Sequence, residues 1–512
     1  MVDNAAFIGL ATLVVFFYLI QKITTISLSR EEPPLLKPRV PLIGHIIGLL
    51  RHEAAYFPIL RARAKTPAVT MPLLNEKDYV IFSPHMTQQA MRHRNLDFLD
   101  VAMVFNKSVA GISDRGMAKS AERGPNTYVP EAMAAIKTGL MGQNLYRTND
   151  ALLAYVASQL NDIGAGVEGL HVPSLWLWMR GMITMATTEA LYGQANPFRD
   201  DPEGLDSLWG FDDAVAQMLT MPGPLARAGA RHRDRVVSTL RPYFEARLHR
   251  NDDASKFVAL PSDVSVKHNW VGDDLCKSGV MSLWASTTNS IAALFWTLTN
   301  VYLHPGLIER LRGEILPHVT FSEQDGKRKA TLNIRQIEKQ CPVLVGCQRE
   351  SVRSNSHMVA RRAITADTLL TDEDGTSYLL KKGSNVMWSA KVAHKLPDVW
   401  GADTDDFNPE RFVTEPEDKD TEKKRRTAYM PFGGGAHLCP GRQLALDEIL
   451  GLVSALVIGF EIEGLYPENV KTGRMMMASG ISKPARDGDG GKVTLKRREG
   501  WEDVQWSFAC YP

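Results

Sequence analysis

Residues 431–442, PFGGGAHLCPGR, decide the fold of this chain. Three consecutive glycines and the later Gly441 allow backbone turns that other residues rarely adopt, and they let the chain approach a flat ligand closely. Pro440 restricts the backbone directly after Cys439. Beyond it, apolar residues recur at the spacing of one helix face, at Leu444, Ala445, Ile449, Leu450, Val453 and Leu456. Cys439 is therefore predicted to lie just before the first turn of an apolar helix.

The position of Cys439 favours a thiolate that binds haem iron. A helix N-terminus carries partial positive charge and free N–H groups, which stabilise ionised sulfur. Two other interpretations compete. A single cysteine is most often a small buried apolar residue, and that is the interpretation for the other four cysteines. A glycine-rich turn before a helix can also bind phosphate, but the strand-linked Gly-x-Gly-x-x-Gly pattern and Gly-Lys-Ser/Thr are absent here.

Composition sets broad limits. The chain has 512 residues, 44% hydrophobic and 23% charged, as in an ordinary globular protein, and its net charge of +1 gives no indication of a nucleic-acid partner. Five cysteines, without Cys-x-x-Cys spacing, argue against a disulfide framework or a zinc site. Reduced thiols in a reducing compartment fit better.

An apolar segment near the N-terminus predicts a membrane anchor. Residues 5–20 are interrupted only by Thr12 and Tyr18, and the segment is just short of the usual spanning length. A cleaved signal peptide and a buried helix are the alternatives. Asp3, rather than a basic region, precedes the segment, and no small-residue cleavage site follows. Positive residues come after it, which places the rest of the chain in the cytosol: Lys22, Arg30, Lys37 and Arg39.

The chain after the anchor divides into a hinge and one large domain. Four prolines at positions 33, 34, 38 and 41 predict a semi-rigid spacer. The expected organisation is an anchor over residues 1–24, a Pro-rich hinge over 25–45 and a single domain over 46–512. Within that domain, strands are expected in residues 68–82 and 379–394, helices over most of 86–257, and a solvated loop at 417–426.

Residues 274–303 predict a long helix that is apolar nearly all round and therefore buried. The exception is a polar patch in its middle, Ser286 to Ser290. Buried polar groups cost free energy unless they find hydrogen-bond partners. The patch is either satisfied within the structure or lines a ligand cavity, and the helix pattern alone leaves both interpretations open.

Three motifs in a fixed order resemble one family. The pattern Phe-x-x-Gly-x-x-x-Cys-x-Gly resembles the signature of the cytochrome P450 haem-thiolate monooxygenases, at Phe432, Gly435, Cys439 and Gly441. Glu350 and Arg353 stand three apart on a predicted helix, so they share one face. Arg411 follows in a Phe-Asn-Pro-Glu-Arg-Phe segment. Alone, a Glu–Arg pair is usually a solvated surface bridge; together, the three motifs identify the chain as similar to this family.

The resemblance implies a fold and a set of site residues. The fold would be mainly α with a small β region, in a single domain that buries haem b against the long helix. Cys439 would be the axial ligand of the haem iron, and the other signature residues, Phe432, Gly435 and Gly441, would surround it. Arg361, Arg362 and His437 stand where the family contacts the haem propionates. Glu350, Arg353 and Arg411 would form a structural charge cluster.

The chain departs from the family in two places. The Trp-x-x-x-Arg motif that meets a propionate is absent from residues 110–160. In the long helix, Thr288 and Asn289 stand where most members have an acid–alcohol pair, and they are the residues expected to line the oxygen site and position water. The segment containing Leu283-Trp284-Ala285-Ser286 resembles the branch of prostacyclin synthase and the cholesterol 7α- and sterol 12α-hydroxylases.

The resemblance implies oxidation of a bulky lipophilic substrate with O2 and electrons from an NADPH–cytochrome P450 reductase. The expected location is the endoplasmic reticulum membrane, with one span and the catalytic domain facing the cytosol. The hinge and loops are typical of fungal members, which suggests a terpenoid or steroid-like substrate in secondary-metabolite biosynthesis. The main alternative is an oxygen-independent isomerase or dehydratase on the same haem fold. A non-catalytic haem-binding membrane protein, a sensor or carrier, is the remote one.

Overall fold

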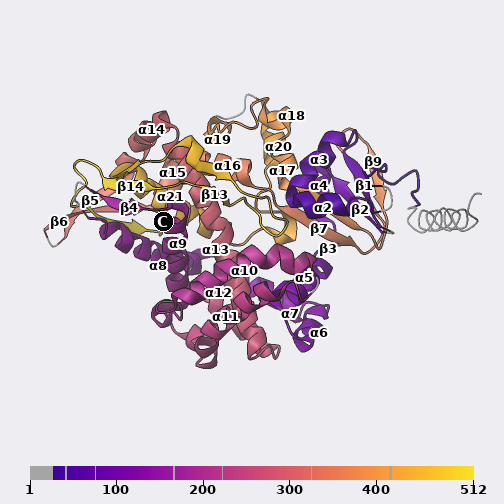
Figure 1. Cartoon of the computed structure of the whole chain (residues 1–512), viewed down its shortest axis with the longest axis horizontal. Coiled ribbons are helices and arrows are strands. Elements are labelled where there is room, and N and C mark those ends of the chain that lie inside the picture. The colour runs from indigo at the N-terminus through magenta and orange to yellow at the C-terminus, as the bar shows by residue number, and fades with distance from the viewer. Residues whose placement is uncertain are drawn as a thin grey trace, which may run out of the picture.

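The computed structural model describes residues 27–40, 43–74, 76–164, 168–221, 223–324, 326–413 and 418–511. The predicted anchor over residues 1–24 lies outside these ranges. Most of the described chain is helical, with small sheets beside the helices, which confirms the mainly α prediction (Figure 1). Within these ranges, only a sharply bent pair of helices, Asp273–Tyr302 with Pro305–His318, has the length and composition of a membrane span, and no single helix does.

The helix α13 (Asp273–Tyr302) occupies the centre of the molecule and confirms the long helix predicted from the sequence. It packs against α9 (Leu175–Tyr192), α16 (Pro342–Asn355) and α21 (Arg442–Gly459). The C-terminal half of α13 is almost entirely buried, because these helices pack around it. This shared core fixes α13 and α21, which follows Cys439, relative to one another.

Residues 84–267 are mostly helical, as expected for residues 86–257. Their bounds are α4 Pro84–Arg92, α5 Leu99–Phe105, α6 Asp114–Ala121, α7 Tyr128–Gly139, α8 Gly142–Asn161, α10 Pro202–Thr220, α11 Arg227–Glu245 and α12 Lys256–Lys267. The helices α10, α11 and α12 gather at the bottom of Figure 1, on one side of α13. Around α16 lie α14 Pro305–Ile315, α15 Ile334–Gln340, α18 Pro397–Trp400 and α19 Glu410–Val413.

A five-stranded sheet lies at the right of Figure 1 and combines strands from the N-terminal part of the chain with two from residues 359–389. Its order is β1-β2-β10-β7-β3, with bounds β1 Ala68–Leu73, β2 Glu76–Ile81, β10 Asn385–Ser389, β7 Val359–Ile364 and β3 Leu96–Asp97. The strands β10 and β2 run parallel, and β10 pairs antiparallel with β7. Two short helices cover one face of the sheet, α2 (Ile46–His52) and α3 (Tyr56–Arg63).

Short strands elsewhere close the domain, and their bounds are β4 Leu170–Val172, β5 Val319–Gln324, β6 Lys327–Asn333, β8 Thr368–Thr371, β9 Ser377–Leu380, β11 Phe460–Glu463, β12 Val470–Thr472, β13 Pro484–Asp489, β14 Val493–Arg497 and β15 Gln505–Ala509.

Three details differ from the sequence expectations. Residues 419–428 form an exposed helix, α20 (Lys419–Ala428), rather than a loop, because Asp418 caps its N-terminus by accepting from the Thr421 N–H (2.7 Å). The predicted strand region ends at Ser389, where α17 (Ala390–Ala393) begins. Part of the Pro-rich hinge lies against β1, with Leu36 buried and its N–H donating to the Thr70 carbonyl (2.9 Å).

Candidate functional site

The Cys439 loop (residues 431–442) is held by its own backbone. Gly433 and Gly435 adopt left-handed φ angles of 70° and 62°, which glycine alone takes without strain. The N–H of Cys439 donates to the carbonyl of Phe432 (3.0 Å). The loop therefore doubles back on itself and presents Cys439 directly before α21, as the sequence predicted.

Gly435 also lies where no side chain fits. A Cβ atom placed on it would stand 2.3 Å from the carbonyl oxygen of Met91, at the end of α4. At the equivalent left-handed position of Gly433, the nearest atom to a Cβ would be 3.6 Å away. The loop is thus pressed onto α4 at Gly435 and is open at Gly433.

The Cys439 thiol is electrostatically distinct from the other cysteines. Burial raises its pKa. The backbone N–H groups of Gly441 and Arg442 lower the pKa in part, and so does the positive charge of Arg442. The other four cysteines are fully buried, and for Cys276 burial raises the pKa to about 11. Of the five, Cys439 alone combines partial exposure with backbone donors aimed at its sulfur. Such an environment suits a thiolate bound to a metal.

The predicted charge cluster is present and buried. The Glu350 carboxylate accepts from Arg353 Nε (2.7 Å) and Nη2 (2.8 Å) and from Arg411 Nη1 (2.6 Å). All three side chains are nearly inaccessible to solvent. Backbone carbonyls take the remaining donors, including Thr404 from Arg353 and Asp403 from Arg411. A buried ion pair is tolerated when every donor is satisfied in this way.

His394 connects this cluster to the Cys439 loop. Its carbonyl accepts from Arg353 Nη1 (2.6 Å), and its Nε2 accepts from the backbone N–H of Met430 (3.1 Å), directly before the loop. Burial lowers the His394 pKa to about 3, so the ring is neutral at physiological pH. Because Nε2 is the acceptor, Nδ1 carries the proton and donates to the Arg353 carbonyl (3.2 Å). The cluster therefore positions the start of the loop.

Arg361 and Arg362 stand on β7 and point to opposite faces of the sheet, as alternate residues of a strand do. The Arg362 guanidinium is buried between the rings of Phe98 (4.7 Å) and Trp388 (5.4 Å). No carboxylate of the described residues forms an ion pair with it, although Asp97 is near enough to raise its pKa against the effect of burial. Arg361 instead pairs with Asp78 (3.0 Å).

His437 lies beside Arg362, so two polar residues predicted from the sequence come together. The His437 and Phe98 ring centroids are 4.9 Å apart. Burial lowers the His437 pKa, and the charges of Arg362 and Lys137 lower it further. A buried cation without a counterion is costly. The pair therefore marks a place for an anionic ligand.

Lys137 is a site residue that the sequence analysis missed. Its Nζ donates to the carbonyl of Ala436 in the Cys439 loop (3.2 Å). Met133, four residues earlier on α7, lines the adjacent cavity. The spacing of Met133 and Lys137 is that of the absent Trp-x-x-x-Arg motif, and this spacing was the available signal. The Trp-x-x-x-Arg spacing itself occurs later in the sequence, at Trp176 and Arg180, but that arginine lies elsewhere and stacks on Trp209 (5.1 Å).

The polar patch of α13 is mostly satisfied by its own helix. The Thr288 hydroxyl donates to the Trp284 carbonyl (3.2 Å), and the side chain is 4% exposed. Ser286, Thr287 and Ser290 likewise donate to carbonyls one turn back. Asn289 differs, because its Oδ1 accepts from the Gly480 N–H (3.0 Å) in the C-terminal loop.

One face of α13 remains accessible in the middle of this otherwise buried helix. Its residues, spaced by three or four, are partly or fully exposed: Met281, Ser282, Ala285, Ser286 and Asn289. This accessible face of α13 includes Asn289 but not the buried Thr288. A buried carboxyl also joins α13 to α21: Glu448 bonds Ser290, and burial raises its pKa to about 8.

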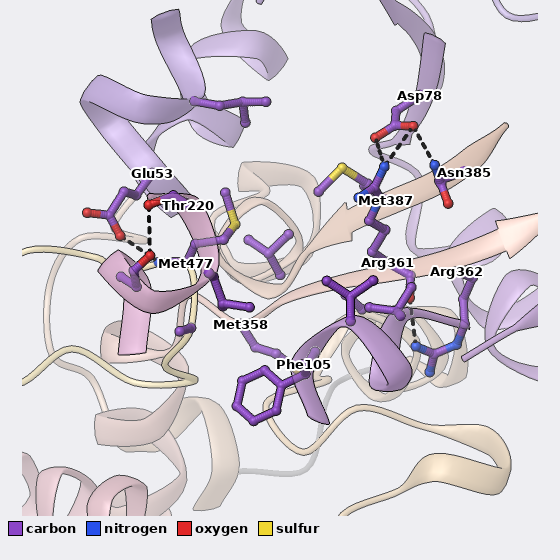
Figure 2. Close-up of a pocket in the computed structure, with 18 of the residues that line it drawn as sticks. Glu53, Asp78, Phe105, Thr220, Met358, Arg361, Arg362, Asn385, Met387 and Met477 are labelled. Atoms are coloured by element: carbon purple, nitrogen blue, oxygen red, sulfur yellow. Dashed lines mark hydrogen bonds and ion pairs between the residues drawn. The ribbon is translucent and has the colours of Figure 1, made fainter. Parts of the chain in front are cut away.

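A cavity of about 1540 Å³ opens between the Cys439 loop, the five-stranded sheet and α10. Figure 2 shows its wall, with Met358, Met387 and Phe105 among the apolar residues. The C-terminal loop contributes Met476, Met477 and Ala478 to the lining. From the Cys439 loop, the lining takes residues 432–434 and His437. Neither Cys439 nor the accessible face of α13 is among the residues that line this cavity.

The family model for cytochrome P450 matches residues 206–486 of this sequence, more than half of the chain. The chain belongs to the cytochrome P450 family. It is also 31% identical to a cytochrome P450 monooxygenase of Gibberella zeae over 98% of this chain and 95% of that protein.

Two mammalian relatives confirm the branch expected from the sequence. Bovine prostacyclin synthase is 23% identical, with 85% of this chain and 88% of that protein covered. The 7-alpha-hydroxycholest-4-en-3-one 12-alpha-hydroxylase of Oryctolagus cuniculus is 24% identical with the same coverage. The family and these relatives together identify the chain as a cytochrome P450 monooxygenase of a fungal type.

The family implies a haem-thiolate cofactor, and the residues present fit that group. Haem carries two propionate carboxylates, which match the unpaired Arg362 beside His437. Its iron requires a thiolate with room around the sulfur, which Cys439 offers. Of the predicted cofactor residues, Arg361 stands apart, since it faces Asp78 on the other side of the sheet.

Proposed function

We propose that this P450 monooxygenase inserts oxygen into a bulky lipophilic substrate, with Cys439 as the axial ligand of haem b. The observation that carries the proposal is the environment of Cys439. It is the one partly exposed cysteine of the five, and two backbone N–H groups at the start of α21 point at its sulfur. When bound, haem supplies the activation of O2, and the thiolate donates electron density that favours O–O cleavage.

In this proposal the other residues of the Cys439 loop shape and hold the cofactor site. Phe432 shields the sulfur, and Gly435 and Gly441 keep the backbone close to it. Arg362 and His437 bind propionate oxygens, with Lys137 serving in place of the absent arginine. Glu350, Arg353 and Arg411 act indirectly, because their cluster orients His394 and thereby the start of the loop.

Asn289 and Thr288 are proposed to act on the oxygen side. Asn289 Oδ1 is occupied by the Gly480 N–H, so its Nδ2 hydrogens are the ones left to hold water at the accessible face of α13. An amide does not titrate, and the proton required by the reaction therefore arrives through that water. Thr288 supports the helix rather than the water, since its hydroxyl is bonded to the Trp284 carbonyl.

Electrons are proposed to arrive from an NADPH–cytochrome P450 reductase on the Cys439 side. A groove of about 860 Å³ there reaches Phe432 at its floor. Basic residues outnumber acidic ones in its lining: Arg349, Arg411, Lys419, Arg425, Arg426 and Arg442 against Glu338, Asp418 and Glu422. A lining with a net positive charge attracts an acidic protein partner. The exposed helix α20 contributes three of the basic residues, Lys419, Arg425 and Arg426.

We propose the organisation expected from the sequence: an anchor over residues 1–24, a hinge over 25–45 and a catalytic domain over 46–512 facing the cytosol at the endoplasmic reticulum. Exposed apolar side chains support contact with a membrane. They come from α2, the β1–β2 turn and the α10–α11 connection: Ile47, Leu50, Leu74, Met221 and Leu225. Leu50, Leu74 and Met221 also line the cavity, so a lipophilic substrate would enter from the bilayer side.

The substrate class proposed is terpenoid or steroid-like, within secondary-metabolite biosynthesis. The size and apolar lining of the cavity and the sterol-derived name of the Oryctolagus relative support it. The second candidate, an isomerase or dehydratase on the same fold, is favoured by Asn289, which places an amide where an acid–alcohol pair is usual. Dependence of turnover on NADPH and reductase separates the two functions.

The test is the carbon-monoxide difference spectrum of the reduced protein, with Cys439→Ser and Cys276→Ser alongside. The expected result is the thiolate-type Soret band in the native protein and in Cys276→Ser, and its loss in Cys439→Ser. A thiolate-type band that survives in Cys439→Ser would overturn the proposal. Turnover of lipophilic substrates without NADPH would assign the isomerase function instead.

A further inference from the structure

A polar cluster interrupts the apolar wall of the large cavity. Arg361 on β7, Asp78 on β2 and Asn385 on β10 all project from the sheet face that meets α2 and α3 (Figure 2). Asp78 stands opposite Asn385 in the parallel pairing. All three residues line the cavity, and nothing in the cofactor site uses them.

The carboxylate of Asp78 sets the orientation of its two partners. Its Oδ2 pairs with Arg361 Nη2 (3.0 Å), and its Oδ1 accepts from Asn385 Nδ2 (2.9 Å). Because a carboxylate only accepts hydrogen bonds, the Asn385 amide must turn its nitrogen toward Asp78. The Asn385 carbonyl oxygen is then left for another donor, and none of the described residues supplies one.

Arg361 keeps donors free as well. One of its nitrogens, Nη2, is taken by Asp78, while Nη1 donates to no other described residue. The Arg361 side chain is 40% exposed, whereas Asp78 is 3% exposed. The wall therefore offers the cavity a hydrogen-bond donor on the Arg361 guanidinium and, on the other side of Asp78, an acceptor on the Asn385 amide.

The charges at this wall exclude an acidic ligand. Asp78 neutralises Arg361, and Glu76, exposed at the same end of the cavity, adds a further negative charge. A free carboxylate would meet repulsion from both acidic residues. A neutral group that both accepts and donates a hydrogen bond matches the donor and the acceptor together, and a hydroxyl group is such a group.

We propose that Arg361 and Asn385 bind a hydroxyl group already present on the lipophilic substrate, and so determine which substrates are accepted and how they are oriented. The hydroxyl oxygen accepts from the Arg361 guanidinium, and the hydroxyl hydrogen is donated to Asn385 Oδ1. The proposal rests on the proposed function, and it adds that the substrate is a pre-oxygenated alcohol. The reaction that supplies this substrate must then be one that leaves a hydroxyl group, such as an oxygenation, a hydrolysis or the reduction of a ketone.

The experiment uses three probes that share one tetracyclic skeleton: androstane, androstan-3β-ol and androstan-3-one. Binding to the full-length holoenzyme is measured by calorimetry and by perturbation of the haem Soret band. The quantity compared is the ratio of alcohol affinity to hydrocarbon affinity. The solvation of the free ligands is the same for every variant, so it drops out when this ratio is compared between variants.

In the Asp78→Asn/Arg361→Met variant this ratio should fall about tenfold, as for loss of a hydrogen bond to a charged donor. The paired substitution avoids leaving a lone buried carboxylate. Asn385→Ala removes no charge and stays informative if the paired variant does not fold. It should weaken the alcohol about threefold or more and leave the ketone unchanged, because a ketone has no hydrogen to donate.

The matched control is Arg474→Met. Arg474 also lines the cavity and also pairs with a carboxylate, that of Glu53 (2.7 Å), so its loss should leave the ratio unchanged. The inference would be overturned if the ratio were unchanged in the Arg361 and Asn385 variants, or if it fell equally in Arg474→Met. In either case, binding of androstane would still uphold the proposed function. Failure of all three probes to bind would overturn the proposed substrate class together with the inference.

Discussion

The Cys439 loop and the accessible face of α13 are built in different ways. In the loop, left-handed glycines and a hydrogen bond between Phe432 and Cys439 fix the geometry within a dozen residues. On α13, the helix supplies only a scaffold, and the character of the face depends on side chains such as Asn289. That side chain is in turn held by Gly480, which is 191 residues away in the sequence.

The difference explains where this chain keeps the family pattern and where it departs from it. A backbone conformation that requires glycine admits almost no substitution, since any Cβ meets strain or a neighbouring atom. A helix face accepts many side chains, because the helix persists whichever of them it carries. The same contrast applies to Lys137, which reaches the loop from a helix that lacks the usual motif.

The largest expected effect is on the charge cluster that supports the Cys439 loop. Glu350→Gln should destabilise the protein by about 3–5 kcal/mol, because Arg353 and Arg411 then lack their shared buried counterion. The measurement is guanidinium chloride denaturation followed by circular dichroism. As the control, Glu122→Gln breaks the exposed Lys119–Glu122 pair and should cost at most about 0.5 kcal/mol. Similar losses in the two variants would contradict a buried, loop-supporting cluster.

Alanine at Gly435 tests whether backbone geometry alone decides the loop. Gly435→Ala should cost about 2–4 kcal/mol, since it adds a contact with the Met91 carbonyl to the left-handed strain. Gly433→Ala has the strain without the contact and should cost about 1 kcal/mol. Denaturation and haem content report both variants. Equal costs would show that the fit against α4 contributes nothing.

Glu448 joins α13 to α21, the helix that follows the Cys439 loop, and its titration should be visible in the stability of the protein. Its pKa is raised by burial from 4.5 to about 8, so the folded state retains a proton that the unfolded state loses. This stabilising contribution is complete below about pH 4.5 and is lost as the pH rises toward 8, with a slope of at most about 1.4 kcal/mol per pH unit.

The Glu448→Gln variant should lack this slope, because a neutral amide does not titrate. Unfolding free energies measured at pH 5, 6, 7 and 8 give the comparison with the native protein. Glu468→Gln, at an exposed carboxyl, serves as the control and should retain the native slope. An unchanged slope in Glu448→Gln would show that the buried group is not the titrating one.

The smallest expected effect is at Asn289. Asn289→Ala removes the acceptor of the Gly480 N–H and should cost about 1 kcal/mol of stability. Hydrogen exchange of the Gly480 amide should accelerate accordingly. Asn289→Asp keeps an acceptor oxygen and should restore the protection of that amide. Slow exchange in Asn289→Ala would mean that the C-terminal loop is held without this contact.

Local patterns in the sequence predicted a large part of this structure. The long helix, the Cys439 loop, the Glu350–Arg353 pair and the strands of residues 68–82 all follow from spacing or from backbone restrictions between near neighbours. Residues 417–426 were expected as a loop because their charges indicate solvent. Charge reports exposure, however, and an exposed segment with an Asp418 cap is free to be helical.

The sequence by itself determined the family, the cysteine presented before α21, and the order of the three motifs, because glycine conformations and helix spacing act over a few residues. Only the tertiary structure decided which way Arg361 and Arg362 point, what Lys137 reaches, and that Asp78 and Asn385 meet Arg361. Strand alternation separates the two arginines once residues 359–364 are known to form a strand. Asp78, which pairs with both Arg361 and Asn385, comes from a strand about 280 positions before Arg361, and Asn385 comes from one about 24 positions after it. Only sheet pairing brings the three strands together.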